Sequence, residues 1–157
     1  MDSLLEKQMR LEQLMPLIQE NLAAGKTVRF SPRGISMLPM LRQGVDSVVL
    51  SPAPDKLRKY DIPFYRRDDG KFILHRVVKV RENGYVILGD NCLNKEYGIK
   101  EDEVIGVMTS FVRDGKEYPV SHKGYRLYAS VWYMLYPIRK VWMIGKGKCR
   151  KLLQKVR

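Results

Sequence analysis

The chain has 157 residues, of which 45% are hydrophobic and 29% charged, and this composition excludes a disordered or fibrous protein. Its net charge of +12 is concentrated at one end, because ten of the 29 Lys and Arg residues lie between Tyr118 and Arg157, where Asp and Glu are absent. The other 19 basic residues are matched by all 17 acidic ones, so the first 117 residues carry a net charge of only +2 and offer no second basic surface.

Residues 1–26 predict one amphipathic helix that packs on the rest of the protein. It is expected to end near Gly25, with Pro16 as a site for a kink. Charged residues interrupt the apolar positions, so no signal peptide is predicted and the chain is expected in the cytoplasm or peripherally on the cytoplasmic membrane. The apolar residues at helical spacing are Leu4, Leu11, Met15, Ile18 and Leu22.

Residues 27–120 predict a compact, curled and mostly antiparallel β domain. Short runs rich in β-branched and aromatic residues alternate with turn signals such as Asn83-Gly84 and Asp114-Gly115. Such a series of short strands is typical of closed or strongly curled sheets. The expected strands are 28–30, 46–50, 61–66, 72–81, 85–88 and 104–112.

Residues 121–157 predict an amphipathic basic helix, bent at Pro137. Its apolar run is too short to cross a bilayer, which takes roughly twenty mainly apolar residues. A helix on an anionic membrane surface fits better, although packing of the apolar face on the β domain is the alternative. The apolar positions are Leu127, Val131, Met134, Leu135, Ile138, Val141 and Trp142; the aromatic residues expected at the lipid headgroups are Tyr128, Trp132, Tyr133, Tyr136 and Trp142.

The few residues able to do acid–base or nucleophilic chemistry narrow the choice of site. His75 and His122 are the two histidines, which excludes a metal site with several histidine ligands, and neither a metal nor a cofactor is expected. Cys92 and Cys149 lie far apart and outside any metal-type spacing, so both are predicted to be free thiols.

Three polar residues stand at positions where side chains are presented rigidly. Ser36 lies between Gly34 and Pro39, His75 lies within a predicted strand, and Asp90 follows the next one. Each has an ordinary structural explanation as well, since Gly, Ser, Pro, Asp and Asn build turns and a histidine can be half-buried in a strand.

Four short motifs occur in a fixed order: Gly-Ile-Ser-Met-Leu-Pro from Gly34, His-Arg-Val from His75, Gly-Asp-Asn from Gly89, and Val-Ile-Gly-Val from Val104. Together they resemble the signal peptidase I family of the S24/S26 serine peptidase group, over roughly residues 27–114. Most bacterial relatives have a lysine before Arg-Val. The histidine in this chain resembles the ER and archaeal-type branch.

The resemblance implies a set of catalytic residues. Ser36 is expected to be the nucleophile and His75 the base that accepts its proton. In the same branch an acid follows the Gly-Asp-Asn aspartate by six residues, which corresponds to Glu96, with Asp90 and Asp102 as competing orienting groups. Met37 and Pro39 are expected to contact substrate, and the positions expected to shape the site are Gly34, Gly89, Asp90 and Asn91.

One departure from the family weakens the expected oxyanion hole. Relatives often place a serine two residues before the nucleophile, and this chain has Gly34 there. Cys92 raises the alternative of a thiol hydrolase, although a small buried filler is the simpler interpretation of that residue.

The sequence therefore predicts a serine endopeptidase that removes a leader or signal segment from a precursor peptide. A non-catalytic relative that binds an extended peptide at a strand edge is the first alternative. A nucleic-acid-binding protein that uses the basic tail is the second. The expected partners are the precursor peptide and an anionic membrane surface, and nucleic acid is not expected.

Overall fold

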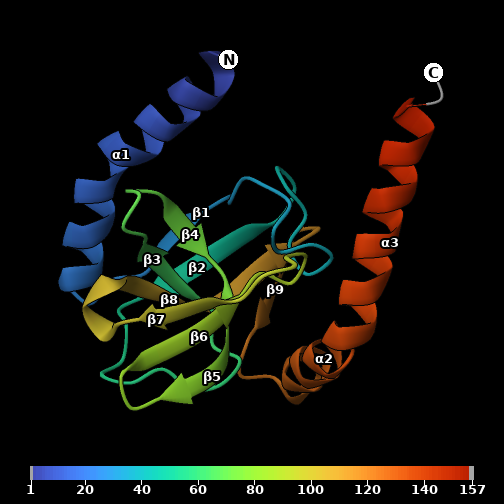
Figure 1. The fold of residues 1–157 in the computed structure, drawn as a ribbon. Coiled ribbons are helices and arrows are strands. Elements are labelled where there is room, and N and C mark those ends of the chain that lie inside the picture. The colour runs from blue at the N-terminus through green and yellow to red at the C-terminus, as the bar shows by residue number, and fades with distance from the viewer. Residues whose placement is uncertain (1, 156–157) are drawn as a thin grey trace.

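A computed structural model describes the backbone of residues 2–155 and the side chains of residues 13–146. Two antiparallel sheets form the middle of the molecule, and helices lie on either side of them (Figure 1). The predicted mainly β fold, antiparallel and flanked by an N-terminal and a C-terminal helix, is confirmed. Leu4, Leu11 and Cys149 lie outside the residues whose side chains are described.

The larger sheet has the order β1-β2-β8-β3-β4. β3 pairs with the N-terminal half of β8, and β9 pairs with its C-terminal end. Strand β8 alternates buried and more exposed residues along much of its length, as a half-buried antiparallel strand should. Asp114 and Gly115 both have positive φ angles, of 50° and 78°, which suits the tight turn into β9. The strands are β1 Val28–Phe30, β2 Ser47–Ser51, β3 Pro63–Arg66, β4 Phe72–Leu74, β8 Val104–Arg113 and β9 Lys116–Pro119.

The smaller sheet has the order β5-β6-β7, formed by Arg76–Arg81, Gly84–Leu88 and Glu96–Ile99. Every residue of β6 is buried, because one face of this sheet packs on the larger sheet and the other lies under the C-terminal helices. The 3-10 helix η1, Glu101–Glu103, connects β7 to β8. Sequence analysis missed β7 and β9, since both are short, and exposed residues predominate in them.

The predicted strand 72–81 is wrong in one respect that matters for the site. It is two strands, β4 in the larger sheet and β5 in the smaller one, and His75 occupies the junction. His75 is only 4% exposed there. His75 therefore lies where the chain passes from one sheet to the other.

Helix α1, Asp2–Ala23, packs one side on the larger sheet. Met15, Ile18 and Leu22 enter the main core together with β2, β3 and β8 residues, which confirms these three positions of the predicted apolar face. The helix ends before Gly25, whose φ of 74° is the left-handed conformation usual after a helix C-terminus.

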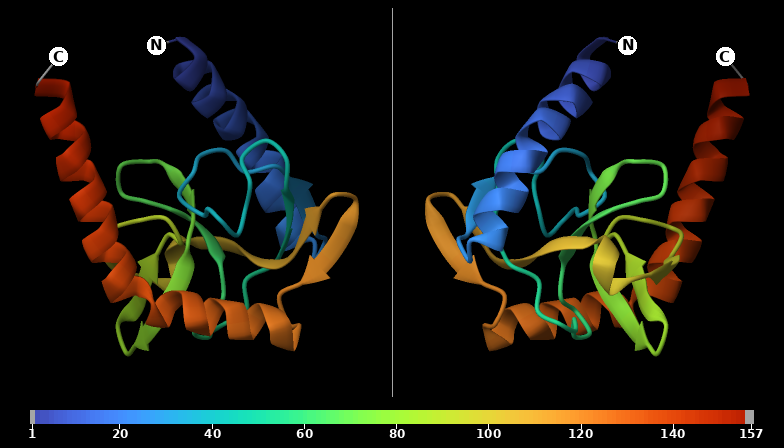
Figure 2. Two further views of the ribbon diagram at one scale, coloured as in Figure 1. Left: turned by 90° about the vertical axis from the view of Figure 1, so that its right-hand side faces the viewer. Right: turned by 90° about the vertical axis from the view of Figure 1, so that its left-hand side faces the viewer.

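The C-terminal segment forms two helices instead of one bent helix. Helix α2, Lys123–Met134, and helix α3, Tyr136–Lys155, are separated at Leu135, and Pro137 falls in the first turn of α3, where a proline is tolerated. Along the described part of the chain, the helices lack the combination of length and apolar character that crossing a bilayer requires. Two further views show α2 crossing below the sheets, while α1 and α3 extend toward the same end of the molecule (Figure 2).

Candidate active site

His75 and Glu96 form a hydrogen-bonded pair at the seam between the two sheets. Nδ1 of His75 lies 2.8 Å from Oε1 of Glu96, which is the first residue of β7. The edge position of β7 turns the Glu96 carboxylate toward the β4–β5 junction, and the His75 ring is buried beside it.

The Glu96 carboxylate is held by two further residues of the larger-sheet side. Tyr65 donates its hydroxyl to Oε2 at 2.9 Å, and Arg67 donates to both oxygens at 2.6 Å in a bidentate pair. Burial alone raises the pKa of Glu96, but the hydrogen bonds from His75, Arg67 and Tyr65 outweigh it and lower the pKa to about 2. Glu96 is therefore ionised throughout the neutral range.

An ionised Glu96 fixes the tautomer of His75. A carboxylate can only accept hydrogen bonds, so Nδ1 of the imidazole carries the proton and Nε2 of the neutral ring presents a lone pair. Burial acts to lower the pKa of His75, whereas hydrogen bonding to Cys92 and Glu96 raises it, and the net pKa lies above its ordinary value. The arrangement is that of a general base with an orienting acid on its far side.

Ser36 lies in a turn between β1 and β2 that the Gly-Asp-Asn segment holds in place. The N–H of Asn91 donates to the Ser36 carbonyl at 2.7 Å, and the Asn91 side-chain amide donates to the Ile35 carbonyl at 3.1 Å. Gly34 has a φ of 101°, a conformation that residues with a side chain rarely adopt. A serine at this position would strain the backbone, although there is space for its side chain.

Gly89 is the point at which the Ser36 turn and the His75 ring meet. A Cβ atom at this glycine would lie 2.8 Å from His75 Nε2 and 2.8 Å from the Ser36 carbonyl oxygen. Both distances are shorter than atoms of this kind tolerate, so only glycine fits between them. The structure thus brings the base and the serine turn to one place, although their residues are far apart in sequence.

Cys92 is the side chain that faces Nε2 of His75. Its Sγ lies 3.9 Å from Nε2, and it is a half-buried free thiol. Within the part of the chain that the structure describes, no hydrogen bond from the Ser36 hydroxyl is present, so the thiol occupies the position facing the lone pair. Cys92 also packs against the Val78, Val86 and Leu88 cluster, as the interpretation of a small filler expects, but it is half-buried and its thiol faces the ring.

Asp90, considered above as a group that could orient His75, pairs with Arg76 instead. Its carboxylate forms a buried bidentate pair with Arg76, with distances of 2.8 and 2.7 Å, and both side chains are at most 3% exposed. Tyr125 accepts a further hydrogen bond from Arg76 at 2.7 Å. Asp90 therefore anchors the loop after β6 and does not contact His75.

The other predicted site residues divide between the core and the surface. Met37 is 5% exposed and belongs to the main hydrophobic core, so the structure gives it a packing role in place of the expected substrate contact. Pro39 is exposed beside the serine turn. Asp102 lies exposed in η1, where it lines a surface hollow with Gln19 and Arg66, and it makes no hydrogen bond to His75.

Sequence analysis missed three residues that hold the carboxylates of the site region in place. Tyr65 and Arg67 hold Glu96, and Arg76 holds Asp90. Only Arg76 had a signal in the sequence, since it follows His75 directly in the His-Arg-Val motif. No spacing rule links Arg67 to Glu96, because Arg67 follows β3 of the larger sheet and Glu96 begins β7 of the smaller one.

No protein-family model matches this chain, and searches of curated proteins and of solved structures found no significant match.

The chemical capacity of the site follows from these contacts. It offers an imidazole with a fixed tautomer, an ionised acid behind it, and two candidate nucleophiles: Cys92, whose thiol faces Nε2, and Ser36, whose backbone turn meets the ring at Gly89. The backbone N–H groups of Ser36 and Met37 make no hydrogen bond among the described residues. Such a set serves acyl transfer.

Proposed function

We propose that this protein is a serine endopeptidase of the signal peptidase I type, in which Ser36 is the nucleophile, His75 the general base and Glu96 the orienting acid. The observation that carries the proposal is the 2.8 Å hydrogen bond between His75 Nδ1 and Glu96 Oε1, with Nε2 directed to the Gly89 position that the Ser36 turn also contacts. The antiparallel β domain, which the resemblance implies, is consistent with it.

In this mechanism Ser36 Oγ attacks the carbonyl carbon of the scissile peptide bond while His75 Nε2 accepts the hydroxyl proton. The imidazolium that forms is stabilised by ionised Glu96, and it then donates its proton to the leaving amine. Water hydrolyses the resulting ester by the same route, again with His75 as base. The resemblance implies that the substrate is a precursor peptide from which a leader is removed, with small side chains on the N-terminal side of the cut.

A thiol hydrolase is the second candidate, because the Cys92 thiol lies 3.9 Å from the same Nε2. In that case Cys92 Sγ attacks the carbonyl carbon and His75 and Glu96 keep their roles. The two candidates differ only in the attacking atom, so they are separable by substitution.

The test is covalent labelling with a fluorophosphonate probe, which phosphonylates activated serines with loss of fluoride, followed by mass spectrometry of the labelled peptide. We expect labelling at Ser36 in the wild type and in Cys92→Ala, and none in Ser36→Ala or His75→Ala. Ser121→Ala, at an exposed serine before α2, is the matched control and should label like the wild type.

The result that rejects the serine mechanism is equal labelling of all variants. If instead an iodoacetamide-type probe on Cys92 abolishes peptide cleavage that Ser36→Ala retains, the thiol mechanism replaces it. Retained binding of an extended peptide without cleavage in any variant would favour the non-catalytic peptide-binding protein.

A further inference from the structure

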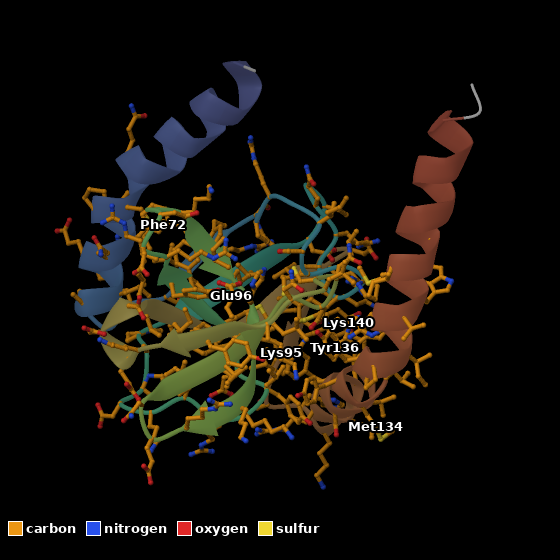
Figure 3. All side chains as sticks on the ribbon, viewed as in Figure 1. Phe72, Lys95, Glu96, Met134, Tyr136 and Lys140 are labelled. Atoms are coloured by element: carbon orange, nitrogen blue, oxygen red, sulfur yellow. The ribbon has the colours of Figure 1, made fainter. Side chains whose placement is uncertain are left out.

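A strip of apolar side chains lies exposed along the outer side of α2 and α3. We call it the aliphatic strip; its members and their exposed fractions are Leu127 67%, Val131 41%, Met134 70%, Ile138 68%, Val141 72% and Trp142 63%. Figure 3 shows Met134 directed away from the β sheets. Isolated exposed apolar residues are ordinary, but a continuous row of them over two helices marks an interaction surface.

The aliphatic strip is the outer face of a docked helix, because the opposite face of α2 packs on the β domain. Ala129 is fully buried, and Tyr125 and Tyr128 pack against the Arg76–Asp90 pair. Trp132 donates to the Asp90 carbonyl at 3.0 Å. The alternative in which the apolar face packs on the β domain is therefore wrong, since this face is exposed. Of the aromatic residues expected at the lipid headgroups, Trp142 is exposed and the other four are half-buried on the protein.

The junction of the two helices is fixed as well. Arg139 donates to the Asp90 carbonyl at 2.6 Å, and Tyr136 donates to the Leu93 carbonyl at 2.6 Å. Lys95, beside Glu96, lies over the Tyr136 ring at 5.1 Å, and Figure 3 shows these side chains together between the sheets and α3. The strip cannot be covered by the β domain unless these contacts break.

Charge decides which partner suits the strip. The segment from Tyr118 to Arg157 contains ten Lys and Arg residues and no acidic residue. Lys146 lies exposed 4.9 Å from the centroid of the Trp142 ring, so a cation flanks the strip at its α3 end. Packing the strip of one copy on that of another would bring two strongly basic segments together, whereas a surface of negative headgroups over acyl chains satisfies both the charge and the apolar side chains.

We propose that the aliphatic strip binds an anionic lipid bilayer, with α2 and α3 lying in its interface and the basic residues against the headgroups. This inference goes beyond the proposed peptidase activity and stands without it. Because Trp132 and Arg139 hold the Asp90 carbonyl, a bound protein would also carry the His75–Glu96 site at a fixed position relative to the lipid surface.

The test is flotation of the full chain with vesicles of phosphatidylcholine alone and of phosphatidylcholine mixed equally with phosphatidylglycerol. We expect binding to the mixed vesicles only, weakened by added salt. Replacing four strip residues together, Leu127→Ser, Met134→Ser, Ile138→Ser and Val141→Ser, should lower this binding at least about a hundredfold. Lys146→Gln should lower it about fivefold.

The matched control is Leu14→Ser with Leu17→Ser. These leucines are also exposed, at 51% and 56%, but α1 carries Asp2, Glu6, Glu12 and Glu20 against Lys7 and Arg10. The control should bind mixed vesicles like the wild type. Circular dichroism and the unfolding midpoint, unchanged in all variants, would show that the loss is not misfolding.

Three results would overturn the proposal. The first is undiminished vesicle binding by the strip variant. The second is a stable dimer in solution that the same four substitutions abolish and that vesicles do not dissociate. The third is tighter binding to a single-stranded oligonucleotide than to mixed vesicles, since nucleic acid would use the cations without the strip.

Discussion

His75 Nδ1 lies 2.8 Å from the Glu96 carboxylate, and this one contact joins the junction of β4 and β5 to the edge strand of the smaller sheet. It is a strong contact because Arg67 and Tyr65 hold the carboxylate from its other side. The His75–Glu96 pair therefore determines which ring nitrogen is free to accept a proton and the pH range in which the ring is neutral.

The activity should rise with pH through a pKa above about 6.5, the ordinary value for histidine. The pKa of His75 is raised, and only its neutral form can accept a proton, so the base becomes competent at a higher pH than an unperturbed imidazole. The rate of fluorophosphonate labelling, measured from pH 5 to 9, checks this. An acidic limb centred below 6.5 would contradict it.

Glu96→Gln should slow labelling by about a hundredfold to ten-thousandfold, because the amide neither stabilises the imidazolium nor enforces the tautomer. It should also move the acidic limb of the pH–rate profile to lower pH. His75 loses one of the contacts that raise its pKa, while burial continues to lower that pKa. Asp102→Asn is the control, as Asp102 lies away from the ring, and it should leave both rate and limb unchanged. A slower rate with an unmoved limb would indicate a structural role only.

Gly89→Ala should reduce labelling more than tenfold. The added methyl group would lie 2.5 Å from Cys92 Sγ and 2.8 Å from His75 Nε2, so the ring or the serine turn must move, at a cost of about 1–3 kcal/mol in folding stability. Gly145→Ala, in a helical position with open space around it, should change neither quantity. If Gly89→Ala were labelled like the wild type, the ring and the serine turn would have more space at Gly89 than these distances allow.

Cys92 should be alkylated by iodoacetamide with the help of His75. In a Cys149→Ser background, Sγ displaces iodide and Nε2 accepts the thiol proton, so His75→Ala should slow the reaction about tenfold. The adduct would fill the space before Nε2 and block fluorophosphonate labelling of Ser36. Mass spectrometry follows both. Ser36→Ala should alkylate normally, so this result is independent of the serine mechanism.

Arg76→Met should lower the free energy of unfolding by about 3–5 kcal/mol, because it leaves the buried Asp90 carboxylate without its bidentate partner. Arg66→Met, at an exposed arginine, should stay within about 0.5 kcal/mol. Urea unfolding followed by circular dichroism measures both. Adding Asp90→Leu to Arg76→Met should recover part of the lost unfolding free energy, because the unpaired carboxylate is removed. A second decrease as large as that of Arg76→Met would contradict the pairing.

The sequence by itself determined the mainly β fold and the helices at its two ends. Runs rich in β-branched and aromatic residues, turn residues such as Asp114-Gly115 and the helical spacing of Met15, Ile18 and Leu22 depend on near neighbours in the chain, so they can be interpreted without coordinates. The motifs likewise selected Ser36, His75 and Glu96 as candidates.

Only the tertiary structure decided how those candidates meet. Whether Asp90, Glu96 or Asp102 faces the imidazole depends on where β4 leaves one sheet for the other, and no local signal marked that break at His75. The same holds for the tail: its apolar and aromatic residues were evident, but which face packs on the protein follows from buried partners such as Asp90, 42 residues away from Trp132. Long-range pairing is set by shape and desolvation, which spacing in a sequence does not record.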